Sequence, residues 1–258
     1  MKILVIGSGN MGSVFIRYLS KKHSVIVCDR GSGKGEALAS EVGATYVQDV
    51  QKAVEGVDII ILAVKPKDYE DLASKLTSFL PATCYVISLL VGVSIARLKK
   101  AFPETDVIRL MPNTAISVSQ GILGFSGGNL SLEERTLMES IFSSLGLVFW
   151  ILESKMEAFA ALAASSPAFI FVLLESMIDS GLHIGFSVEE SRKIVLQVLE
   201  GCVTLLRETD LSLQELKWQI SSPGGTTIAG LKALEESAFR AGIWNAIEAT
   251  YQKSLSLE

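Results

Sequence analysis

The sequence has 258 residues, enough for one large domain or two modest ones, and carries a net charge of −5. Hydrophobic residues make up 49% of it and charged residues 20%, which is typical of a globular protein with a packed core. An acidic balance without a basic stripe argues against nucleic acid as a partner and favours a small ligand held by local donors.

The cysteines and the N-terminus indicate the compartment. Cys28, Cys84 and Cys202 lie far apart and show neither metal-ligand nor redox spacing, so we expect no metal site and three reduced core thiols. The N-terminus runs directly into a strand pattern without the layout of a signal peptide. We therefore expect a cytoplasmic protein.

One apolar segment, residues 158–174, contains no charged residue. It is slightly shorter than a usual membrane span and includes Pro167. We therefore expect no contact with a membrane, and interpret the segment as a buried helix of a helical domain.

Residues 1–150 alternate short apolar runs with helical patterns. The runs are continuously apolar, which is typical of strands covered by helices on both faces. Strands separated by helices predict βαβ units and a parallel sheet. The expected strands are residues 3–6, 25–28, 58–64, 85–87, 107–110 and 147–150, and the expected helices are residues 11–22, 34–42, 67–79 and 132–145.

The pattern changes after Trp150, and the rest of the chain shows no convincing strand. Ser187 followed by Glu190 predicts a capping box at a helix start. The expected helices are residues 153–183 with a kink near Pro167, 187–208, 226–236 and 238–256. The predicted fold class is thus an α/β domain over residues 1–151 followed by an all-helical domain over residues 152–258.

A glycine-rich loop follows the first expected strand and opens the first expected helix. Gly7, Gly9 and Gly12 fit the spacing G-x-G-x-x-G in the context that dinucleotide binding requires. Gly7 permits the tight turn, Gly9 lets the backbone approach a pyrophosphate, and Gly12 lets helix and strand pack closely. The helix N-terminus then offers N–H groups and a positive dipole end to the phosphates. The loop therefore predicts a Rossmann-type dinucleotide-binding domain.

The end of the second expected strand bears on the choice of dinucleotide. An acidic residue here takes the ribose 2′-OH of NAD, whereas a nearby arginine accommodates the 2′-phosphate of NADP. This chain has both, as Asp29 and Arg30, and Ser32 and Lys34 are also able to reach a phosphate. We expect NADP(H) to be preferred, with NAD(H) as the alternative.

Three further segments have the form of ligand loops. Residues 63–66 and residues 109–114 each end a strand, where an open α/β sheet binds its ligand. Residues 221–227 lie in the helical domain, where Pro223 and two glycines break one helix and two threonines open the next. Unpaired N–H groups at such a start suit an anion such as a carboxylate. The alternative is a plain interhelical turn.

The ordered set of motifs resembles the pyrroline-5-carboxylate reductase family over nearly the whole length. The resemblance rests on the glycine-rich loop together with Val64-Lys65-Pro66, Val91-Gly92-Val93, Arg109-x-Met111-Pro112-Asn113-Thr114, Ser165-Ser166-Pro167-Ala168-Phe169, Asp179-Ser180-Gly181 and Ser222-Pro223-Gly224-Gly225-Thr226-Thr227.

The resemblance implies that the protein reduces the imine carbon of 1-pyrroline-5-carboxylate to give L-proline, the last step of proline biosynthesis, with hydride from a nicotinamide. Backbone N–H groups of Ser222, Gly225 and Thr226 would hold the substrate carboxylate. The Thr227 hydroxyl would hydrogen-bond to the ring nitrogen as the catalytic group. The family also forms dimers through its helical domain, so we expect a homodimer or a higher homo-oligomer.

The same resemblance, together with the loops described above, assigns the cofactor contacts. The residues expected to bind the dinucleotide are Gly7, Gly9, Asn10, Met11, Gly12, Asp29, Arg30, Ala63, Val64, Lys65, Pro66 and Asn113.

Some positions depart from the family pattern. Residues 89–91 are bulkier than usual, Ala115 replaces a proline, and Ala164 replaces a glycine. Bulk at Leu90 would crowd a nicotinamide pocket. Two alternatives therefore stay open: a non-catalytic or regulatory paralogue that binds dinucleotide, and a reductase of another small cyclic imine. A β-hydroxyacid dehydrogenase shares the layout but needs a lysine on the long helix, where residues 156–174 contain none.

Overall fold

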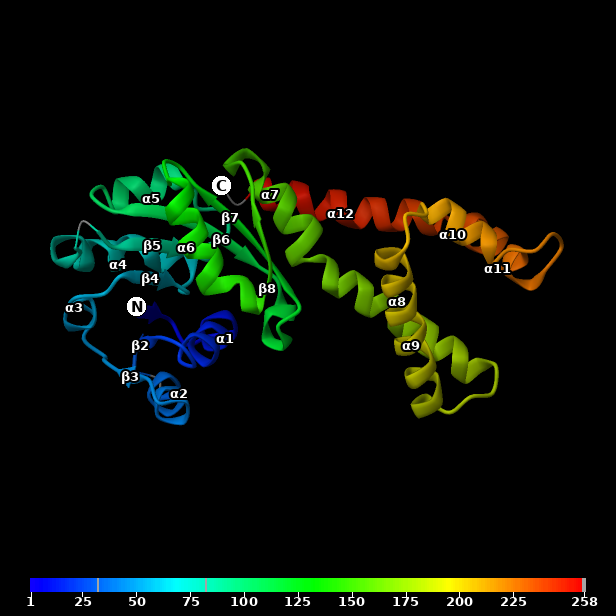
Figure 1. The fold of residues 1–258 in the computed structure, drawn as a ribbon, viewed down its shortest axis with the longest axis horizontal. Coiled ribbons are helices and arrows are strands. Elements are labelled where there is room, and N and C mark those ends of the chain that lie inside the picture. The colour runs from blue at the N-terminus through cyan, green and yellow to red at the C-terminus, as the bar shows by residue number, and fades with distance from the viewer. Residues whose placement is uncertain (32, 82, 257–258) are drawn as a thin grey trace. The chain divides into compact units, whose positions relative to one another are not determined.

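The structure, a computed structural model, describes residues 1–31, 33–81 and 83–256. Contacts divide the chain into two compact units (Figure 1). The first comprises Met1–Ser165 and the chain from Thr250 on, and the second comprises Ser166–Ala249. The predicted boundary after residue 151 follows the last strand, whereas the contacts group the next helical turns, up to Ser165, with the sheet.

In the described part of the chain, the first unit is built on an eight-stranded sheet. Its strands are β1 (Lys2–Ile6), β2 (Ser24–Cys28), β3 (Thr45–Tyr46), β4 (Ile59–Leu62), β5 (Tyr85–Ser88), β6 (Asp106–Pro112), β7 (Gly121–Gly127) and β8 (Gly146–Trp150). They lie in the order β3-β2-β1-β4-β5-β6-β7-β8, and every neighbouring pair is parallel except β6 and β7. The order reverses between β1 and β4, the switch point at which a Rossmann sheet binds its ligand.

Helices cover both faces of this sheet, and the buried side chains form a separate core on each face. One core includes residues of α1 (Asn10–Leu19), α2 (Lys34–Val42) and α6 (Leu132–Phe142). The other includes residues of α3 (Val50–Ala53), α4 (Tyr69–Leu76) and α5 (Ile95–Ala101). Because successive strand residues point to opposite cores and both are buried, the strands are continuously apolar, as predicted.

Strand β7 is absent from the sequence prediction because three of its seven residues are glycines, which are depleted in strands. The structure gives the reason for the glycines. A Cβ atom on Gly124 would lie 2.4 Å from the Phe159 ring, and one on Gly121 would lie 2.3 Å from the Ile116 side chain. Tertiary packing thus selects glycine where local propensity opposes a strand. The prediction also misses β3, α3 and α5, which are short.

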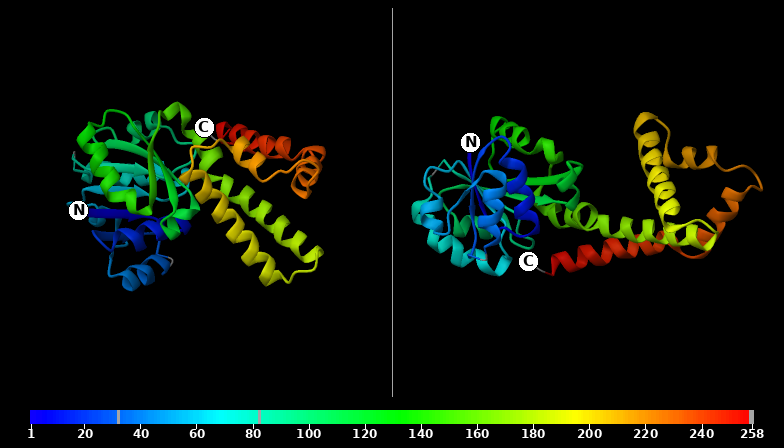
Figure 2. Two further views of the ribbon diagram at one scale, coloured as in Figure 1. Left: turned by 45° about the vertical axis from the view of Figure 1, so that its right-hand side comes forward. Right: turned by 90° about the horizontal axis from the view of Figure 1, so that it is seen from below.

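Residues 166–249, all of them described, contain helices and no strand, as predicted. The helices are α8 (Ser166–His183), α9 (Val188–Glu208), α10 (Leu213–Gln219), α11 (Thr226–Glu236) and the first part of α12 (Phe239–Leu255). Helices α8 and α9 pack side by side (Figure 2). Ser187 and Glu190 form the predicted capping box, and Ser212 and Glu215 form another at α10, which the sequence analysis missed.

A change in helix type lies just before Pro167, where the sequence predicts a kink. A short helix α7 (Met156–Phe159) leads into a π-helical segment, Ala160–Ala164, before α8 begins at Ser166. A π-helical turn shifts the direction of the side chains that follow it, and such turns are frequent at functional positions.

The helical unit leaves much apolar surface uncovered. None of the described residues of α8 is buried within the chain; Phe171 is 65% exposed, and Trp244 in α12 is 75% exposed. The prediction that residues 158–174 form a buried helix is therefore wrong for most of that segment in a single chain. The run Glu153–His183 is long and apolar enough to cross a membrane by length and composition alone, a test that core helices of soluble proteins also pass.

A buried ion pair ties the end of α12 to the sheet inside the first unit. Arg109 on β6 is 2% exposed, and its Nη2 lies 2.6 Å from Glu157 Oε1 on α7. The Ser254 hydroxyl on α12 donates to Glu157 Oε2 at 2.5 Å. Arg109 Nη1 lies 3.6 Å from Glu153 Oε1 and, like Nε, has no hydrogen-bond partner among the described residues. Removing one charge of such a pair leaves the other buried and uncompensated.

We therefore expect Arg109→Leu to lower the free energy of unfolding by about 3–5 kcal/mol, because Glu157 loses its counter-charge. Equilibrium urea unfolding at fixed protein concentration, followed by circular dichroism, measures this change. Arg17→Leu is the matched control, since it removes an exposed ion pair with Glu41 and should barely move the urea midpoint. Equal destabilisation by both variants would contradict the importance of the buried pair.

Candidate functional site

The glycine-rich loop joins β1 to α1 at the switch point of the sheet. The Gly7 N–H donates to the Cys28 carbonyl at 2.8 Å, and its φ of +109° lies in the region that favours glycine. A Cβ atom on Gly7 would lie 2.4 Å from the Ala63 carbonyl oxygen, and one on Gly12 would lie 1.9 Å from the Gly7 oxygen. Only glycines at these two positions let α1 begin this close to β1 and β4.

Gly9 differs from Gly7 and Gly12, the other two glycines of the loop, because it faces open space. Apart from atoms of Gly9 and its two chain neighbours, no described atom lies within 4 Å of where its Cβ would be. Gly9 is the N-cap of the ten-residue helix α1, and no described side chain caps that helix. Uncapped N–H groups beside an open glycine, at the carboxyl edge of a parallel sheet, fit the pyrophosphate of a dinucleotide. Asn10 lies exposed in the first turn, and Met11 is half-buried against the core.

The loop after β4 lies on the other side of the switch point. The Ala63 N–H donates to the Ile6 carbonyl at 2.9 Å, which places this loop beside the glycine-rich loop. Lys65 precedes a short 3-10 helix, Pro66–Asp68, and its carbonyl accepts the Asp68 N–H at 2.9 Å. Ala63 and Val64 are half-buried, whereas Lys65 and Pro66 are exposed at the carboxyl end of the strand.

Asn113 directly follows β6 and helps to hold the unpredicted strand β7. Its side-chain oxygen accepts the Ile122 N–H at 3.2 Å, while its own N–H donates to the Ile122 carbonyl at 3.2 Å. The side-chain oxygen thus extends the β6–β7 pairing. The amide nitrogen of Asn113 and the second lone pair of its side-chain oxygen remain for the predicted contact with a ligand.

Asp29, at the end of β2, is surrounded by protein donors. Its Oδ2 accepts hydrogen bonds from the Ser8 hydroxyl at 2.5 Å and the Gly35 N–H at 3.0 Å. Its Oδ1 accepts from the Gly31 N–H and the Tyr46 hydroxyl, both at 3.0 Å. Burial opposes ionisation, but the four hydrogen bonds outweigh it and lower the pKa of Asp29, so it is a carboxylate at neutral pH.

Arg30, the next residue, extends into solvent. Its side chain is 81% exposed, and its Nη2 lies 2.8 Å from Asp68 Oδ2. Lys34 begins α2 nearby and is exposed. Ser32, which the sequence analysis placed with these phosphate-binding candidates, lies outside the described residues. An exposed guanidinium in a weak surface pair is free to exchange Asp68 for a phosphate.

In the second unit, residues 221–227 join α10 to α11. The Gly225 N–H donates to the Ser222 carbonyl at 3.0 Å and closes the turn, so this N–H is used within the protein rather than left for a ligand. Gly225 is the N-cap of α11, and no described side chain caps the helix. Thr226 and Thr227 form its first turn, with Thr226 exposed and Thr227 half-buried. The geometry thus leaves an uncapped helix start with a hydroxyl beside it.

Leu90, the bulky residue expected to crowd a nicotinamide pocket, lies in the core instead. Leu90 is 2% exposed, belongs to the core beneath α4 and α5, and donates its N–H to the Ser88 hydroxyl at 3.2 Å. Leu89 packs against the opposite core, and Val91 is exposed. The substitution at Leu90 therefore enlarges a core side chain.

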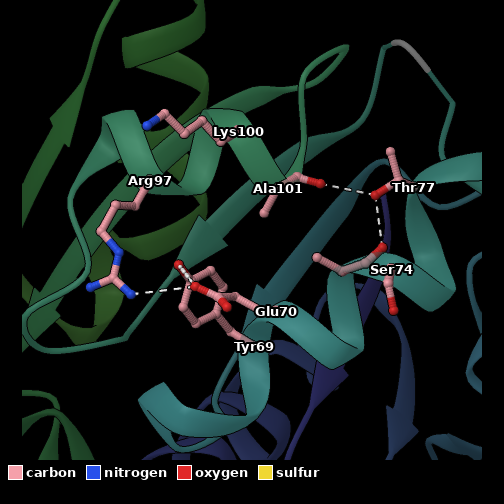
Figure 3. Close-up of a pocket in the computed structure, with 8 residues that line it drawn as sticks. Tyr69, Glu70, Ser74, Thr77, Arg97, Lys100 and Ala101 are labelled. Carbon is pink, nitrogen blue, oxygen red and sulfur yellow. Dashed lines mark hydrogen bonds and ion pairs between the residues drawn. The ribbon is translucent and has the colours of Figure 1, made fainter.

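Residues that the sequence analysis did not select line a pocket of about 510 Å³ between α4 and α5 (Figure 3). The Tyr69 hydroxyl donates to Glu70 Oε1 at 3.0 Å, and Arg97 Nη2 lies 3.4 Å from the same oxygen. The Thr77 hydroxyl donates to the Ala101 carbonyl at 2.9 Å. These polar groups mainly satisfy one another. Apart from the buried Tyr69, they occupy ordinary surface positions of amphipathic helices in the sequence.

The described residues contain no group of three or more His, Cys, Asp or Glu side chains placed to hold a metal ion. Within the same ranges, Cys28 and Cys84 are buried free thiols, but Cys202 is exposed, so the prediction of three core thiols is wrong for Cys202. Burial raises the pKa of Cys28 to about 11 and that of Cys84 to about 12, which keeps both protonated at neutral pH.

The different surroundings of the glycines give a matched pair of substitutions. Gly12→Ala should lower the free energy of unfolding by about 1–3 kcal/mol, because its Cβ has no room against backbone. Gly9→Ala should leave the free energy of unfolding within about 1 kcal/mol of the wild-type value. It should weaken dinucleotide binding, because its methyl group enters the open space beside Gly9 at the start of α1, here called the pyrophosphate cradle. Urea unfolding and fluorescence titration with NADPH measure the two effects. Unchanged NADPH affinity in Gly9→Ala would show that this cradle does not hold the pyrophosphate.

Comparison with known proteins matches two family models to separate parts of the chain. Residues 153–257 match the family described as "Pyrroline-5-carboxylate reductase dimerisation", and residues 2–92 match "NADP oxidoreductase coenzyme F420-dependent". Among solved structures, pyrroline carboxylate reductase of Plasmodium falciparum with NADP bound is 28% identical, with a TM-score of 0.90 over 100% of this chain and 98% of that one. The Streptococcus pyogenes 1-pyrroline-5-carboxylate reductase is 30% identical, with a TM-score of 0.92 over 99% and 98%.

Sequence relatives extend the same result over the full length. The pyrroline-5-carboxylate reductase of Aquifex aeolicus is 36% identical over 100% of this chain and 97% of its own. That of Methanosarcina acetivorans is 33% identical over 99% and 97%. The chain therefore belongs to the pyrroline-5-carboxylate reductase family.

Proposed function

We propose that this protein is an enzyme that reduces 1-pyrroline-5-carboxylate to L-proline with NADPH, the last step of proline biosynthesis. The observation that carries the substrate assignment is the uncapped start of α11, where Thr227 lies half-buried beside free backbone N–H groups. Such a helix start attracts a carboxylate through its N–H groups and its dipole. Membership of the reductase family supports the reaction type.

The chain's residues orient the substrate and manage one proton. NADPH, when bound, supplies the hydride that reduces the imine carbon. The N–H groups of Ser222 and Thr226 hold the substrate carboxylate, while Gly225 shapes the turn through its bond to Ser222. The Thr227 hydroxyl donates a hydrogen bond to the ring nitrogen, which takes up one proton from solvent through that hydroxyl as hydride addition turns the C=N bond into a C–N single bond.

The cofactor is assigned to the edge of the first unit. The loop from Gly7 to Gly12, including Asn10 and Met11, holds the pyrophosphate. Residues 63–66 and Asn113 line the same edge, and Arg30 faces the 2′-phosphate. We propose NADP(H) as the preferred dinucleotide with NAD(H) as the alternative; the NADP-bound structure of the P. falciparum relative supports this order.

We also propose a homodimer or higher homo-oligomer formed through the helical unit. Its large exposed apolar residues need a partner, and residues 153–257 match a dimerisation family. The large apolar residues that are exposed in this unit include Phe171, Val172, Leu182, Leu196, Val203, Leu213, Trp218 and Trp244. The cytoplasm is the proposed location, which suits the free thiols of Cys28 and Cys84.

The direct assay is the oxidation of NADPH, followed at 340 nm, on addition of 1-pyrroline-5-carboxylate. We expect saturable turnover and L-proline as the product. Turnover only with a different cyclic imine would assign the second reductase function. Absence of turnover with NADPH and NADH, with dinucleotide binding intact, would instead favour a non-catalytic paralogue.

Thr227→Ala should lower kcat by about 10²-fold, because the ring nitrogen loses its donor, while the Kd for NADPH stays unchanged. Thr227→Ser keeps the hydroxyl and should recover most of the activity. Ser237→Ala is the matched control, since it removes a hydroxyl from the other end of α11, where that group bonds only to the Leu234 carbonyl. An equal loss of turnover and NADPH affinity in Thr227→Ala would count against its assigned role.

Arg30→Ala should raise the KM for NADPH about tenfold and leave the KM for NADH almost unchanged, because only NADPH carries the 2′-phosphate. Steady-state kinetics with both cofactors measure the two constants. Arg17→Ala, which removes another exposed arginine paired with a carboxylate, is the control and should change neither. Parallel changes in both constants for Arg30→Ala would show that Arg30 does not contact the 2′-phosphate.

A further inference from the structure

The acceptor sites of Asp29 are fully occupied by the protein. An ionised carboxylate has two oxygens and about four lone-pair directions. Oδ2 accepts from the Ser8 hydroxyl and the Gly35 N–H, and Oδ1 accepts from the Gly31 N–H and the Tyr46 hydroxyl. Two donors on each oxygen leave no direction free for a hydroxyl of a ligand.

These donors come from four separate segments. Ser8 lies in the glycine-rich loop, Gly31 follows β2, Gly35 lies in the first turn of α2, and Tyr46 ends β3. A Cβ atom on Gly35 would lie 2.5 Å from Asp29 Oδ2, so the helix start is fitted to the carboxylate. Asp29 therefore fixes the loop after β2 against the pyrophosphate loop.

This arrangement bears on the choice between the two dinucleotides. An acidic residue at the end of the second strand favours NAD(H) when it accepts the ribose 2′-OH. A carboxylate whose acceptors are already filled cannot make that bond without breaking an existing one. The four donors also offset its negative charge, which would otherwise repel a 2′-phosphate beside Arg30.

We propose that Asp29 is a positioning residue rather than a ribose ligand, and that the Ser8 and Tyr46 hydroxyls set the preference for NADP(H) by occupying its oxygens. This inference rests on the proposed function only in that a dinucleotide binds at the glycine-rich loop. The identity of the substrate that is reduced plays no part in this inference.

The test is equilibrium binding of NADPH and of NADH to the full-length protein, without imine substrate, followed by nicotinamide fluorescence. Ser8→Ala opens one acceptor direction of Oδ2 toward the pyrophosphate loop. The ratio Kd(NADH)/Kd(NADPH) should fall about tenfold, because NADH gains a charge-assisted hydrogen bond and NADPH meets a less neutralised carboxylate.

Two further variants test the same mechanism. Tyr46→Phe removes a donor to Asp29 Oδ1 that does not belong to the glycine-rich loop. It should move the ratio Kd(NADH)/Kd(NADPH) in the same direction. Asp29→Asn keeps the size of the side chain but replaces one acceptor by a donor, so it should weaken NADPH and NADH binding alike as the loop loses its anchor. Ser20→Ala, a hydroxyl on α1 that bonds only to the Ile16 carbonyl, is the control and should leave both constants unchanged.

The outcomes separate this proposal from the proposed function. An unchanged ratio in both Ser8→Ala and Tyr46→Phe would overturn it, as would an Asp29→Asn variant that loses NADH affinity alone, since that result identifies a ribose ligand. The wild-type protein could bind both dinucleotides and fail to form proline, while Ser8→Ala and Tyr46→Phe still shift the Kd ratio as expected. That result would support this inference and reject the proposed function.

Discussion

The close approach of three backbone segments at the switch point governs the cofactor half of the molecule. Gly7, Gly12 and Ala63 leave no room for another Cβ atom, because the carbonyl oxygens of Ala63 and Gly7 already occupy that space. This contact brings the start of α1 to the carboxyl edge of the sheet, where its N–H groups face open space in front of Gly9. The neighbouring loops after β2 and β4 are then positioned relative to that cradle by hydrogen bonds.

The residues around Asp29 show that a residue at a motif position can have a different role from the usual one. By its place at the end of β2, Asp29 matches the acidic residue that selects NAD(H). By its contacts, it is a structural anchor for the loop that precedes α2. Arg30, one residue later, points into solvent instead. Two adjacent side chains thus divide the roles of holding the loop and attracting a phosphate.

The helical unit has a different physical requirement. Ser187 and Ser212 cap the starts of α9 and α10, but many of the unit's large apolar side chains stay exposed in a single chain. Exposed aromatic and aliphatic residues on α8, α9 and α12 make a single copy of this unit incomplete. The buried pair of Arg109 and Glu157, together with Ser254, ties the end of α12 to the sheet within the first unit.

Features that depend on local patterns were predictable from the amino-acid sequence alone. Continuous apolar runs gave the main parallel strands, glycine spacing gave the dinucleotide loop, and the helix starts at residues 188 and 226 followed from capping and turn residues. The ordered motifs were also sufficient for the family, since they are specific in combination.

Features that depend on contacts between distant residues are visible only in the folded chain. Strand β7 contains Gly124 because a side chain there would meet the Phe159 ring, a contact that no local propensity encodes. The placement of Leu90 in the core and the use of the Gly225 N–H within its own turn also escaped prediction. Asp29 is the clearest case: its residue type is visible in the sequence, but the four donors that occupy it meet only in the folded chain.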